Sequence, residues 1–325
     1  MTGAGSLAPI GRGLLVAITT PFAVDDSIDL PAFATHVRWL TERGVDGIVV
    51  AGSLGEGSAL SPEERVALVA ETARSAPAGT RIVAAIGASR THDAVALARA
   101  AEHAGATGLL VLPPYVYRPD AREARAHFSA VLDATALPSM LYNNPAAYGT
   151  DTTATDVLAL AQDHANLVAV KESSGDVRRI TAIRTLLGQR VDVAVGLDDV
   201  IVEGITAGAT GWVAGLANAL PRESLALLRS AQARGPETGA LYDWFLPLLR
   251  MDTTVKFVQQ IKMVEAAVGV GSTRVRALQP LASRACPQRS SSASSPPSQP
   301  TSQAAHGTND TATCATLTNT TSAFA

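Results

Sequence analysis

The sequence predicts an α/β fold, a (β/α)8 barrel or TIM barrel, with a C-terminal helical extension. Two observations lead to this fold. Eight short apolar runs alternate with helical patterns along the 325-residue chain, and no glycine-rich phosphate-binding turn follows the first run. A doubly wound sheet usually has fewer strands and carries such a turn, so eight repeated strand–helix units favour the closed barrel.

The predicted strands are short and rich in valine, isoleucine and leucine. This composition is typical of parallel strands that are covered by helices on both faces. In chain order, the strands are expected at Leu14–Thr20, Gly47–Ala51, Arg81–Ile86, Gly108–Leu112, Ser139–Tyr142, Leu167–Lys171, Val191–Val195 and Gly211–Ala214.

The starts of several helices can be recognised from their capping residues. Ser61 is followed by a proline at the first helical position and by Glu64 three residues later, which is the pattern of a capping box. Asp29, Thr91 and Asp120 begin other helical stretches in a similar way.

A short internal repeat supports this assignment of helices and strands. The segments 44–48, 105–109 and 208–212 each begin with a glycine after a helix, turn, and enter a strand through a second glycine. The first glycine suits the left-handed position that ends a helix, and the second allows helix and strand backbones to approach closely. Three copies favour a repeated αβ unit.

The chain is expected to divide into four parts. We predict an N-terminal segment at 1–12, the barrel at 13–220, the helical extension at 221–285 and a disordered tail at 286–325. The tail is rich in serine and threonine and lacks valine, isoleucine, lysine and glutamate, so it cannot bury enough apolar surface to order itself. Helices beyond the last strand are expected at Arg222–Arg234, Thr238–Arg250 and Thr253–Val268.

Charge and composition exclude several classes of function. The formal net charge is -3, from 26 basic and 29 acidic residues, so the chain lacks the basic excess of nucleic-acid-binding proteins. No apolar run approaches the roughly 20 residues of a membrane span, and no secretory signal is visible, so we expect a cytoplasmic protein. Both cysteines lie in the tail and the histidines lack ligand spacing, so we expect neither a metal nor another cofactor.

Lys171 is the first candidate for a catalytic residue. Only three of the 26 basic residues are lysines, and Lys171 ends a predicted strand on the side where barrel enzymes place their active sites. Leu167, Ala169 and Lys171 share one face of this strand. If that face is inward, burial lowers the pKa of the lysine and frees its amine to form a Schiff base with a carbonyl compound. The alternative is a lysine that pairs with a carboxylate or extends to solvent.

Two further candidates lie at the ends of other predicted strands. Tyr142 ends the fifth strand, and its phenol could carry protons to and from a substrate bound to Lys171. In the turn Gly52–Glu56, which follows the second strand, backbone N–H groups could hold a carboxylate and Ser53 could hydrogen-bond Tyr142. Taken alone, Tyr142 could be an ordinary strand residue and the turn could be only a turn.

Together these motifs resemble the dihydrodipicolinate synthase and N-acetylneuraminate lyase family. The resemblance runs from about Gly13 to Leu281, and it implies a (β/α)8 barrel with a C-terminal helical extension, a class I enzyme with a lysine Schiff base, and usually a homotetramer. The matching motifs are Gly52–Glu56 for G-[TS]-x-G-E, Tyr142–Pro145 for Y-N-x-P, Lys171 in V-K-x-[ST], and Gly196–Asp199.

The resemblance also implies roles for the site residues. Lys171 would form the imine with a 2-oxo acid, Tyr142 would relay protons, and Ser53 would take part in catalysis and hold the substrate carboxylate. The remaining substrate-binding residues would be Gly52, Leu54 through its backbone, Gly196 and Val213.

Two positions depart from the family members that make dihydrodipicolinate. Those members carry an arginine two residues after the proline of Y-N-x-P, which holds the carboxylate of the second substrate, and this chain has Ala147 there. They also carry a second tyrosine that reaches the site of a neighbouring subunit, and this chain has Val116 there. Both departures argue against a role in lysine biosynthesis.

One subgroup of the family fits better. Four stretches look like the 1-pyrroline-4-hydroxy-2-carboxylate deaminases of bacterial hydroxyproline catabolism: Pro114–Glu123, Tyr142–Gly149, Lys171–Ile180 and Gly211–Leu216. This likeness implies that the lysine attacks the ring C=N carbon, the ring opens, the 4-hydroxyl leaves, and hydrolysis yields 2,5-dioxopentanoate and ammonia.

The deaminase hypothesis includes an expected pocket and has two competitors. We expect a small pocket with neutral walls beside Tyr148 and Trp212, suited to a five-membered ring with one carboxylate. The alternatives are a pyruvate-dependent aldolase or 4-hydroxy-tetrahydrodipicolinate synthase, and a non-catalytic barrel that binds small carboxylates. A binding protein has no need of Lys171, which favours an enzyme. The expected partners are a small 2-oxo acid or cyclic imino acid and further copies of the chain, with no nucleic acid and no membrane.

Overall fold

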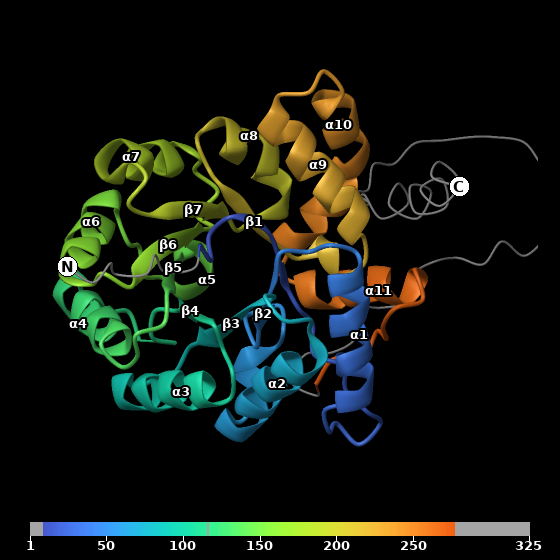
Figure 1. The fold of residues 1–325 in the computed structure, drawn as a ribbon, viewed down its shortest axis with the longest axis horizontal. Coiled ribbons are helices and arrows are strands. Elements are labelled where there is room, and N and C mark those ends of the chain that lie inside the picture. The colour runs from blue at the N-terminus through green and yellow to red at the C-terminus, as the bar shows by residue number, and fades with distance from the viewer. Residues whose placement is uncertain (1–8, 116, 277–325) are drawn as a thin grey trace, which may run out of the picture. The chain divides into compact units, whose positions relative to one another are not determined.

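The central feature of the molecule is a closed barrel of eight parallel strands, shown in Figure 1. The computed structural model describes residues 9–115 and 117–276. Neighbouring strands pair in sequence order and β8 returns to β1, so the predicted (β/α)8 barrel is confirmed. The strands are β1 (Gly13–Ala17), β2 (Gly47–Val50), β3 (Arg81–Ile86), β4 (Gly108–Val111), β5 (Ser139–Asn143), β6 (Leu167–Glu172), β7 (Asp192–Val195) and β8 (Gly211–Ala214).

Helices on the outside of the barrel cover the strands. Every residue of β2, β4, β7 and β8 is buried, which explains the apolar runs that the sequence shows without alternation. The helices that follow the first seven strands are α1 (Leu30–Glu42), α2 (Pro62–Ser75), α3 (Thr91–His103), α4 (Ala121–Leu132), α5 (Pro145–Tyr148), α6 (Ala154–Asp163), α7 (Arg178–Leu187) and α8 (Ile201–Thr206), with single 3-10 turns at η1 (Gly57–Ala59) and η2 (Asp198–Val200).

Most of the predicted helix caps are present. Ser61 and Glu64 form the capping box at the start of α2. Asp29 and Asp120 accept backbone N–H groups at the starts of α1 and α4. Thr91 is the first helical residue of α3 rather than its cap, which is Arg90, and its hydroxyl lies 3.0 Å from Nδ1 of His127.

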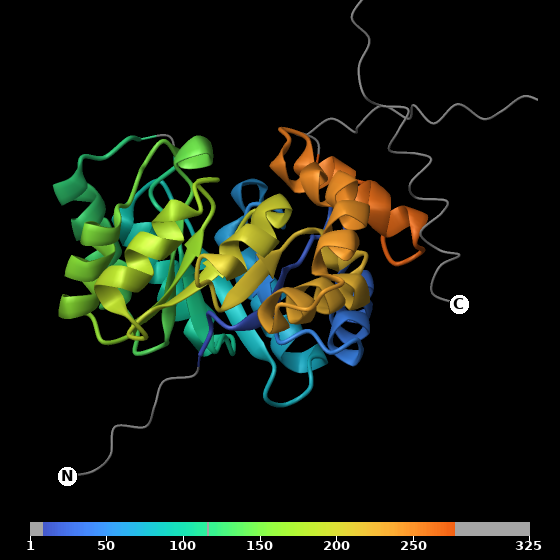
Figure 2. The same ribbon diagram turned by 90° about the horizontal axis from the view of Figure 1, so that it is seen from above.

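Helix α9 lies at the predicted boundary between barrel and extension. After β8 come η3 (Leu216–Asn218) and α9 (Pro221–Ala233), and α9 contacts both β1 and β8. The sequence places this helix in the extension, whereas its contacts are those of a helix that covers the barrel. We propose that the extension begins with α10 (Thr238–Leu249), which is followed by η4 (Arg250–Thr253) and α11 (Phe257–Ala267). Figure 2 shows these last segments grouped together in orange beside the barrel.

The helix predicted at Thr253–Val268 is interrupted at its start. Thr254 has an extended backbone, with φ -96° and ψ 161°, and α11 begins only at Phe257. Threonine and valine lose side-chain freedom in a helix, so the β-branched stretch from Thr253 to Val255 is a weak helix former. The apolar spacing alone does not show this break, which places residues 252–255 on the wall of a cavity.

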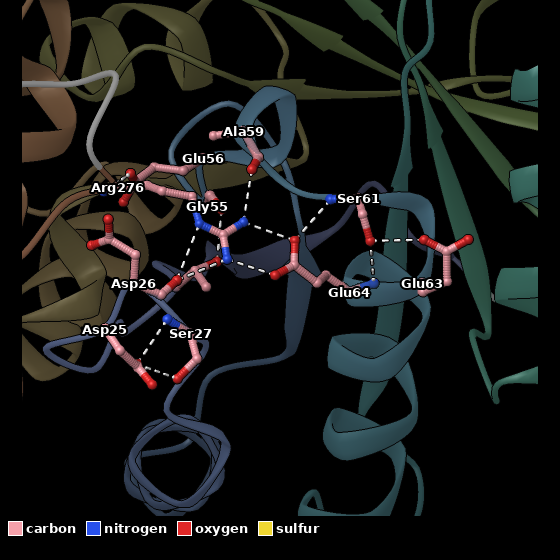
Figure 3. A network of polar contacts seen from close by, with 11 residues as sticks. Asp25, Asp26, Ser27, Gly55, Glu56, Ala59, Ser61, Glu63, Glu64 and Arg276 are labelled. Atoms are coloured by element: carbon pink, nitrogen blue, oxygen red, sulfur yellow. Dashed lines mark hydrogen bonds and ion pairs between the residues drawn. The ribbon is translucent and has the colours of Figure 1, made fainter.

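The end of the described chain is attached to the barrel through Arg276, as Figure 3 shows. Its guanidinium group donates to the carboxylate of Glu64 and to the carbonyl oxygens of Asp26 and Ala59. Its backbone N–H donates to Oε2 of Glu56 at 3.0 Å. The last described residue thus contacts the loops that follow β1 and β2.

A buried ion pair attaches α11 to the same loops. Nζ of Lys262 lies 2.5 Å from Oε1 of Glu56, and the two side chains are 2% and 0% exposed. The remaining protons of this ammonium group are donated to the carbonyl oxygens of Thr20 and Arg274, each at 2.7 Å. Glu56 is the last residue of the predicted turn Gly52–Glu56, so α11 holds this turn in place.

Several predictions fall outside the described residues: the N-terminal segment up to residue 8, Val116, residues 277–285 of the extension, and the tail at 286–325 with both cysteines. Within the described ranges, none of the helices has the length and hydropathy needed to span a bilayer.

Candidate active site

A cavity of about 410 Å³ lies at the ends of strands β2, β5, β6, β7 and β8. It brings together all seven residues that the sequence predicts for the site, which come from segments far apart in the chain. Their catalytic and binding roles stay predictions. The seven residues are Gly52, Ser53, Leu54, Tyr142, Lys171, Gly196 and Val213.

Lys171 and Tyr142 occupy directly paired positions on adjacent strands. The pairing of β5 with β6 sets Tyr142 opposite Lys171, and Nζ of the lysine lies 4.5 Å from the centre of the phenol ring. Both residues are buried at the cavity wall, with exposed fractions of 8% for Lys171 and 5% for Tyr142. A Cβ atom on Gly196 would lie only 2.6 Å from Cε of Lys171, so the absence of a side chain there makes room for the lysine.

One residue further along, the two strands are joined by their side chains. Nδ2 of Asn143 donates to Oε2 of Glu172 at 2.9 Å, and Oε1 of Glu172 accepts the backbone N–H of Ser174. Both strands extend one residue beyond their predicted ends, which includes this buried pair. The contact limits relative movement of the strand ends that carry Tyr142 and Lys171.

The phenol group of Tyr142 is oriented by Asn144. Nδ2 of Asn144 donates to the phenol oxygen at 3.1 Å. Among the described residues, no acceptor for the phenol proton of Tyr142 is present, so this proton is available to a molecule in the cavity. A positioned proton donor beside an amine nucleophile is the arrangement that general acid–base catalysis requires.

The hydroxyl of Ser53 contacts Tyr148 rather than Tyr142, which corrects the expected hydrogen bond. Oγ of Ser53 lies 2.5 Å from the phenol oxygen of Tyr148. Tyr148 ends the single turn α5, and this turn brings its ring to 5.6 Å from that of Tyr142 and 5.7 Å from that of Tyr115. Burial and the neighbouring phenols raise the pKa of Tyr148, so it stays protonated at neutral pH.

The turn that carries Ser53 also presents free backbone donors. No described residue accepts a hydrogen bond from the backbone N–H of Ser53 or Leu54, and both residues line the cavity. Two adjacent amides of this kind form a site for a carboxylate. Glu56, at the end of the same turn, is bound by Lys262 of α11, and this contact limits movement of the turn that carries Ser53 and Leu54.

Ser173 is a polar residue of the cavity that the sequence analysis did not assign to the site. It is 2% exposed, and its hydroxyl has no hydrogen-bond partner among the described residues. A buried hydroxyl without a partner is uncommon, because it loses its hydrogen bonds to water. Ser173 lies two residues after Lys171, on the same side of the chain in an extended strand, and this spacing is the signal that could have identified it.

Two carboxyl groups lie near Lys171. Asp198 is fully buried and accepts hydrogen bonds from Nε1 of Trp212 at 2.9 Å and from the backbone of Gly215 and Leu216. Burial raises its pKa to about 6, although these hydrogen bonds act in the opposite direction. Trp212, beside which the pocket is expected, is fully buried and bound to Asp198; its own side chain does not line the cavity, whereas the adjacent Val213 does.

Asp252 provides the second carboxyl group, and it lines the cavity itself. Its pKa is raised well above the usual value, first by burial and then by the carboxylate of Asp198, while Lys171 acts in the opposite direction. The sequence offers no signal for Asp252, because it lies between two helices of the extension. Among the described lining residues, Lys171 is the only cationic side chain and Asp252 is the only one with a carboxyl group, an acid that the expected neutral wall does not include.

No group of three histidine, cysteine, aspartate or glutamate side chains in the described ranges is placed to hold a metal ion. The residues that line the cavity contribute the amine of Lys171, several hydroxyls and the carboxyl of Asp252, and the carboxyl of Asp198 lies behind the wall. Both carboxyls have raised pKa values. An amine beside a phenol and a carboxylate site can form an imine with a 2-oxo acid or attack a cyclic imine.

The chain is similar to proteins of known family. The model of the dihydrodipicolinate synthetase family matches residues 11–293. A 4-hydroxy-tetrahydrodipicolinate synthase of Persephonella marina is 32% identical over 240 residues, 74% of this chain and 82% of that protein. A probable 5-dehydro-4-deoxyglucarate dehydratase of Saccharopolyspora erythraea is 37% identical over 219 residues, 66% of this chain and 70% of that protein.

A solved structure gives the same result for the fold. The chloride-inhibited dihydrodipicolinate synthase of Acinetobacter baumannii, complexed with pyruvate, superposes with a TM-score of 0.80 and 29% identity, over 84% of this chain and 94% of that chain. With the barrel, the lysine at the end of β6 and the family match over most of the sequence, the chain belongs to the dihydrodipicolinate synthetase family, whose members are lyases that act through a lysine Schiff base.

Proposed function

We propose that this enzyme is a Schiff-base deaminase that converts 1-pyrroline-4-hydroxy-2-carboxylate to 2,5-dioxopentanoate and ammonia. The observation that carries the proposal is the charge of the cavity wall. The turn at Ser53 and Leu54 offers one carboxylate site, and Lys171, the nucleophile, is the only cationic side chain among the described lining residues. A substrate with a single carboxylate fits this wall.

A second carboxylate would have no cationic partner among the described lining residues besides the nucleophile Lys171. Ala147, at the position where synthases carry arginine, lines the cavity without a charge. A missing charge-assisted hydrogen bond costs about 1.5–3 kcal/mol, which is roughly a 10- to 150-fold loss of binding. This loss disfavours the condensation of pyruvate with aspartate semialdehyde.

The proposed reaction begins at the lysine amine. Nζ of Lys171 adds to C2 of the ring C=N bond, and the ring nitrogen takes up a proton and leaves as an amine, so that Lys171 holds C2 as an imine. Loss of a proton from C3, relayed by Tyr142, gives the enamine, and the 4-hydroxyl then leaves as water. The new double bond shifts to a C5 imine. Hydrolysis at C5 and at C2 releases ammonia and 2,5-dioxopentanoate, with net consumption of one water.

We propose that the proton relay is completed within one chain. The phenol of Tyr148 is hydrogen-bonded to Ser53 and its ring contacts that of Tyr142. The resemblance implies that other family members use a tyrosine of a neighbouring subunit, at the position of Val116. Tyr148 supplies a hydroxyl near the same serine, so the relay to solvent does not depend on a partner.

A lysine-pathway synthase is the second candidate function. It is favoured by the names of similar proteins, such as the Persephonella marina synthase. The Saccharopolyspora erythraea relative is named as a probable dehydratase. That name supports the elimination of a hydroxyl in this family, which the deaminase reaction also requires.

Measuring both reactions on one purified sample tests the proposal. We expect ammonia release from 1-pyrroline-4-hydroxy-2-carboxylate to exceed condensation of pyruvate with aspartate semialdehyde by at least about a hundredfold in kcat/KM, from the missing contact at Ala147. Borohydride reduction should trap substrate on Lys171, and Lys171→Arg, which keeps the charge, should lose activity. Efficient condensation without ammonia release would identify a synthase, and an adduct on Lys256 or Lys262 would exclude Lys171 as the nucleophile.

A further inference from the structure

We propose that Asp252 is the general acid that protonates the departing 4-hydroxyl group of the substrate. This inference rests on the proposed deaminase function, in which a hydroxyl must leave from C4. Hydroxide is a poor leaving group, so a positioned proton donor at this atom accelerates the step by roughly 10²–10⁴-fold. Asp252 lines the same cavity as Lys171 and Tyr142.

The position of Asp252 follows from the break between the helices of the extension. It belongs to η4, and residues 252–255, which lie between α10 and the start of α11, line the cavity. Oδ1 of Asp252 lies 2.5 Å from the point that a Cβ atom on Gly215 would occupy. The carboxyl group therefore lies against the residue that follows β8, whereas Tyr142 belongs to β5.

The groups around Asp252 suit a proton donor. Asp198 and Asp199 in η2 are the acidic groups that act on it, and η2 contacts η4. Lys171 in β6 is the cation that acts on it. Burial and the charge of Asp198 raise the pKa of Asp252, so its carboxyl group keeps a proton at a pH where an exposed aspartate has lost it.

The charge on the lysine nitrogen changes during the reaction in a way that assists this acid. At the enamine stage the nitrogen of Lys171 is neutral, so its charge no longer favours ionisation of Asp252, and the carboxyl group holds its proton more firmly. When the hydroxyl leaves, the nitrogen becomes a cationic iminium again. It then stabilises the carboxylate that Asp252 has just become.

The step balances in atoms and electrons. The electron pair of the enamine moves from nitrogen toward C3, a double bond forms between C3 and C4, and the C4–O bond breaks. The proton of Asp252 joins the departing oxygen, which leaves as water. The carboxylate regains a proton from solvent, and the proton that left C3 passes to solvent through Tyr142. The net change of the elimination is the loss of one water from the bound substrate.

The test compares leaving groups in wild-type enzyme and Asp252→Asn. With the 4-hydroxy substrate, we expect Asp252→Asn to lower kcat by roughly 10²–10⁴-fold. With 4-fluoro-1-pyrroline-2-carboxylate, fluoride leaves with much less need of a proton, and fluoride release should fall by less than about tenfold. Asp252→Glu retains a proton donor and should recover part of the lost rate. Asp243→Asn removes an exposed acid of α10, in the same extension but outside the cavity wall, and serves as the control, with little change.

The outcomes separate the acid role from a structural role and from the deaminase function. Equal loss with both substrates, or reduced borohydride trapping of pyruvate on Lys171, would mean that Asp252 only supports the fold, and would overturn the proposal. Unchanged kcat with the 4-hydroxy substrate would overturn the acid role while leaving the deaminase function intact. A wild-type enzyme that is trapped by pyruvate but releases no ammonia would overturn both.

Discussion

Replacing Lys262 by methionine tests how the extension is held on the barrel. The change removes the ammonium group and keeps a side chain of similar length, so packing is largely retained. It leaves the carboxylate of Glu56 buried at 0% exposure without its cation, and it also removes donors to the carbonyl oxygens of Thr20 and Arg274. Removing one partner of a buried ion pair costs about 3–5 kcal/mol.

Part of this loss should be restored by a second substitution. In Glu56→Gln/Lys262→Met the buried charge is gone, so the double variant should be more stable than Lys262→Met alone. The amide oxygen of the glutamine can still accept the backbone N–H of Arg276, which bonds Oε2 of Glu56 at 3.0 Å in the native chain. We expect the two substitutions to be coupled by at least about 1 kcal/mol.

Urea unfolding at pH 7 measures these differences, and rates of thermal inactivation replace it if refolding is incomplete. Lys256→Met is the matched control, because Lys256 is exposed at the beginning of the same helix. It should change stability by less than about 0.5 kcal/mol. Glu56→Gln is measured as the other single variant of the cycle. If Lys262→Met were as stable as Lys256→Met, or if the double variant lost as much stability as Lys262→Met and Glu56→Gln together, the ion pair would not hold α11 on the barrel.

Two further changes have defined outcomes. Tyr148→Phe keeps the ring but removes the hydroxyl that contacts Ser53. The kcat for ammonia release should fall by roughly 10²–10⁴-fold, while borohydride trapping of pyruvate on Lys171 should be unchanged. A normal kcat would show that the ring of Tyr148 only packs against its neighbours. His36 is buried, and burial lowers its pKa to about 4. Between pH 4 and 6.5 the unfolded chain therefore binds a proton at this histidine that the folded chain does not bind. The free energy of unfolding should rise with pH across this range by up to about 3 kcal/mol. The difference in urea stability between pH 4.5 and pH 7 should be smaller in His36→Gln, and an equal difference in both proteins would exclude this histidine as the cause.

The fold could be predicted from local features of the sequence. Continuous runs of valine, isoleucine and leucine occur because each barrel strand is covered on both sides, and capping residues such as Ser61 mark helix starts that need no distant partner. The positions of Lys171 and Tyr142 follow from the same logic, since the carboxyl ends of parallel strands meet at one end of a barrel.

The sequence could not assign features that depend on contacts between distant segments. The partner of Ser53 depends on the direction in which the short helix α5 points Tyr148, and the place of Trp212 depends on its bond to Asp198. Tyr148 and Trp212 are close in sequence to predicted site residues, but the direction and the burial of their side chains are set by packing. The role of α9 in the barrel likewise appears only from its contacts with β1 and β8.

By itself, the sequence determined the barrel, its strand order and the residues that meet at the ends of its strands, because periodicity and composition are local properties. Only the tertiary structure placed Asp252 on the cavity wall and Lys262 against Glu56, residues 206 positions apart. These contacts join the extension to the barrel. No local pattern encodes them, because the contacting segments lie far apart in the chain and meet only when the barrel and the extension have packed together.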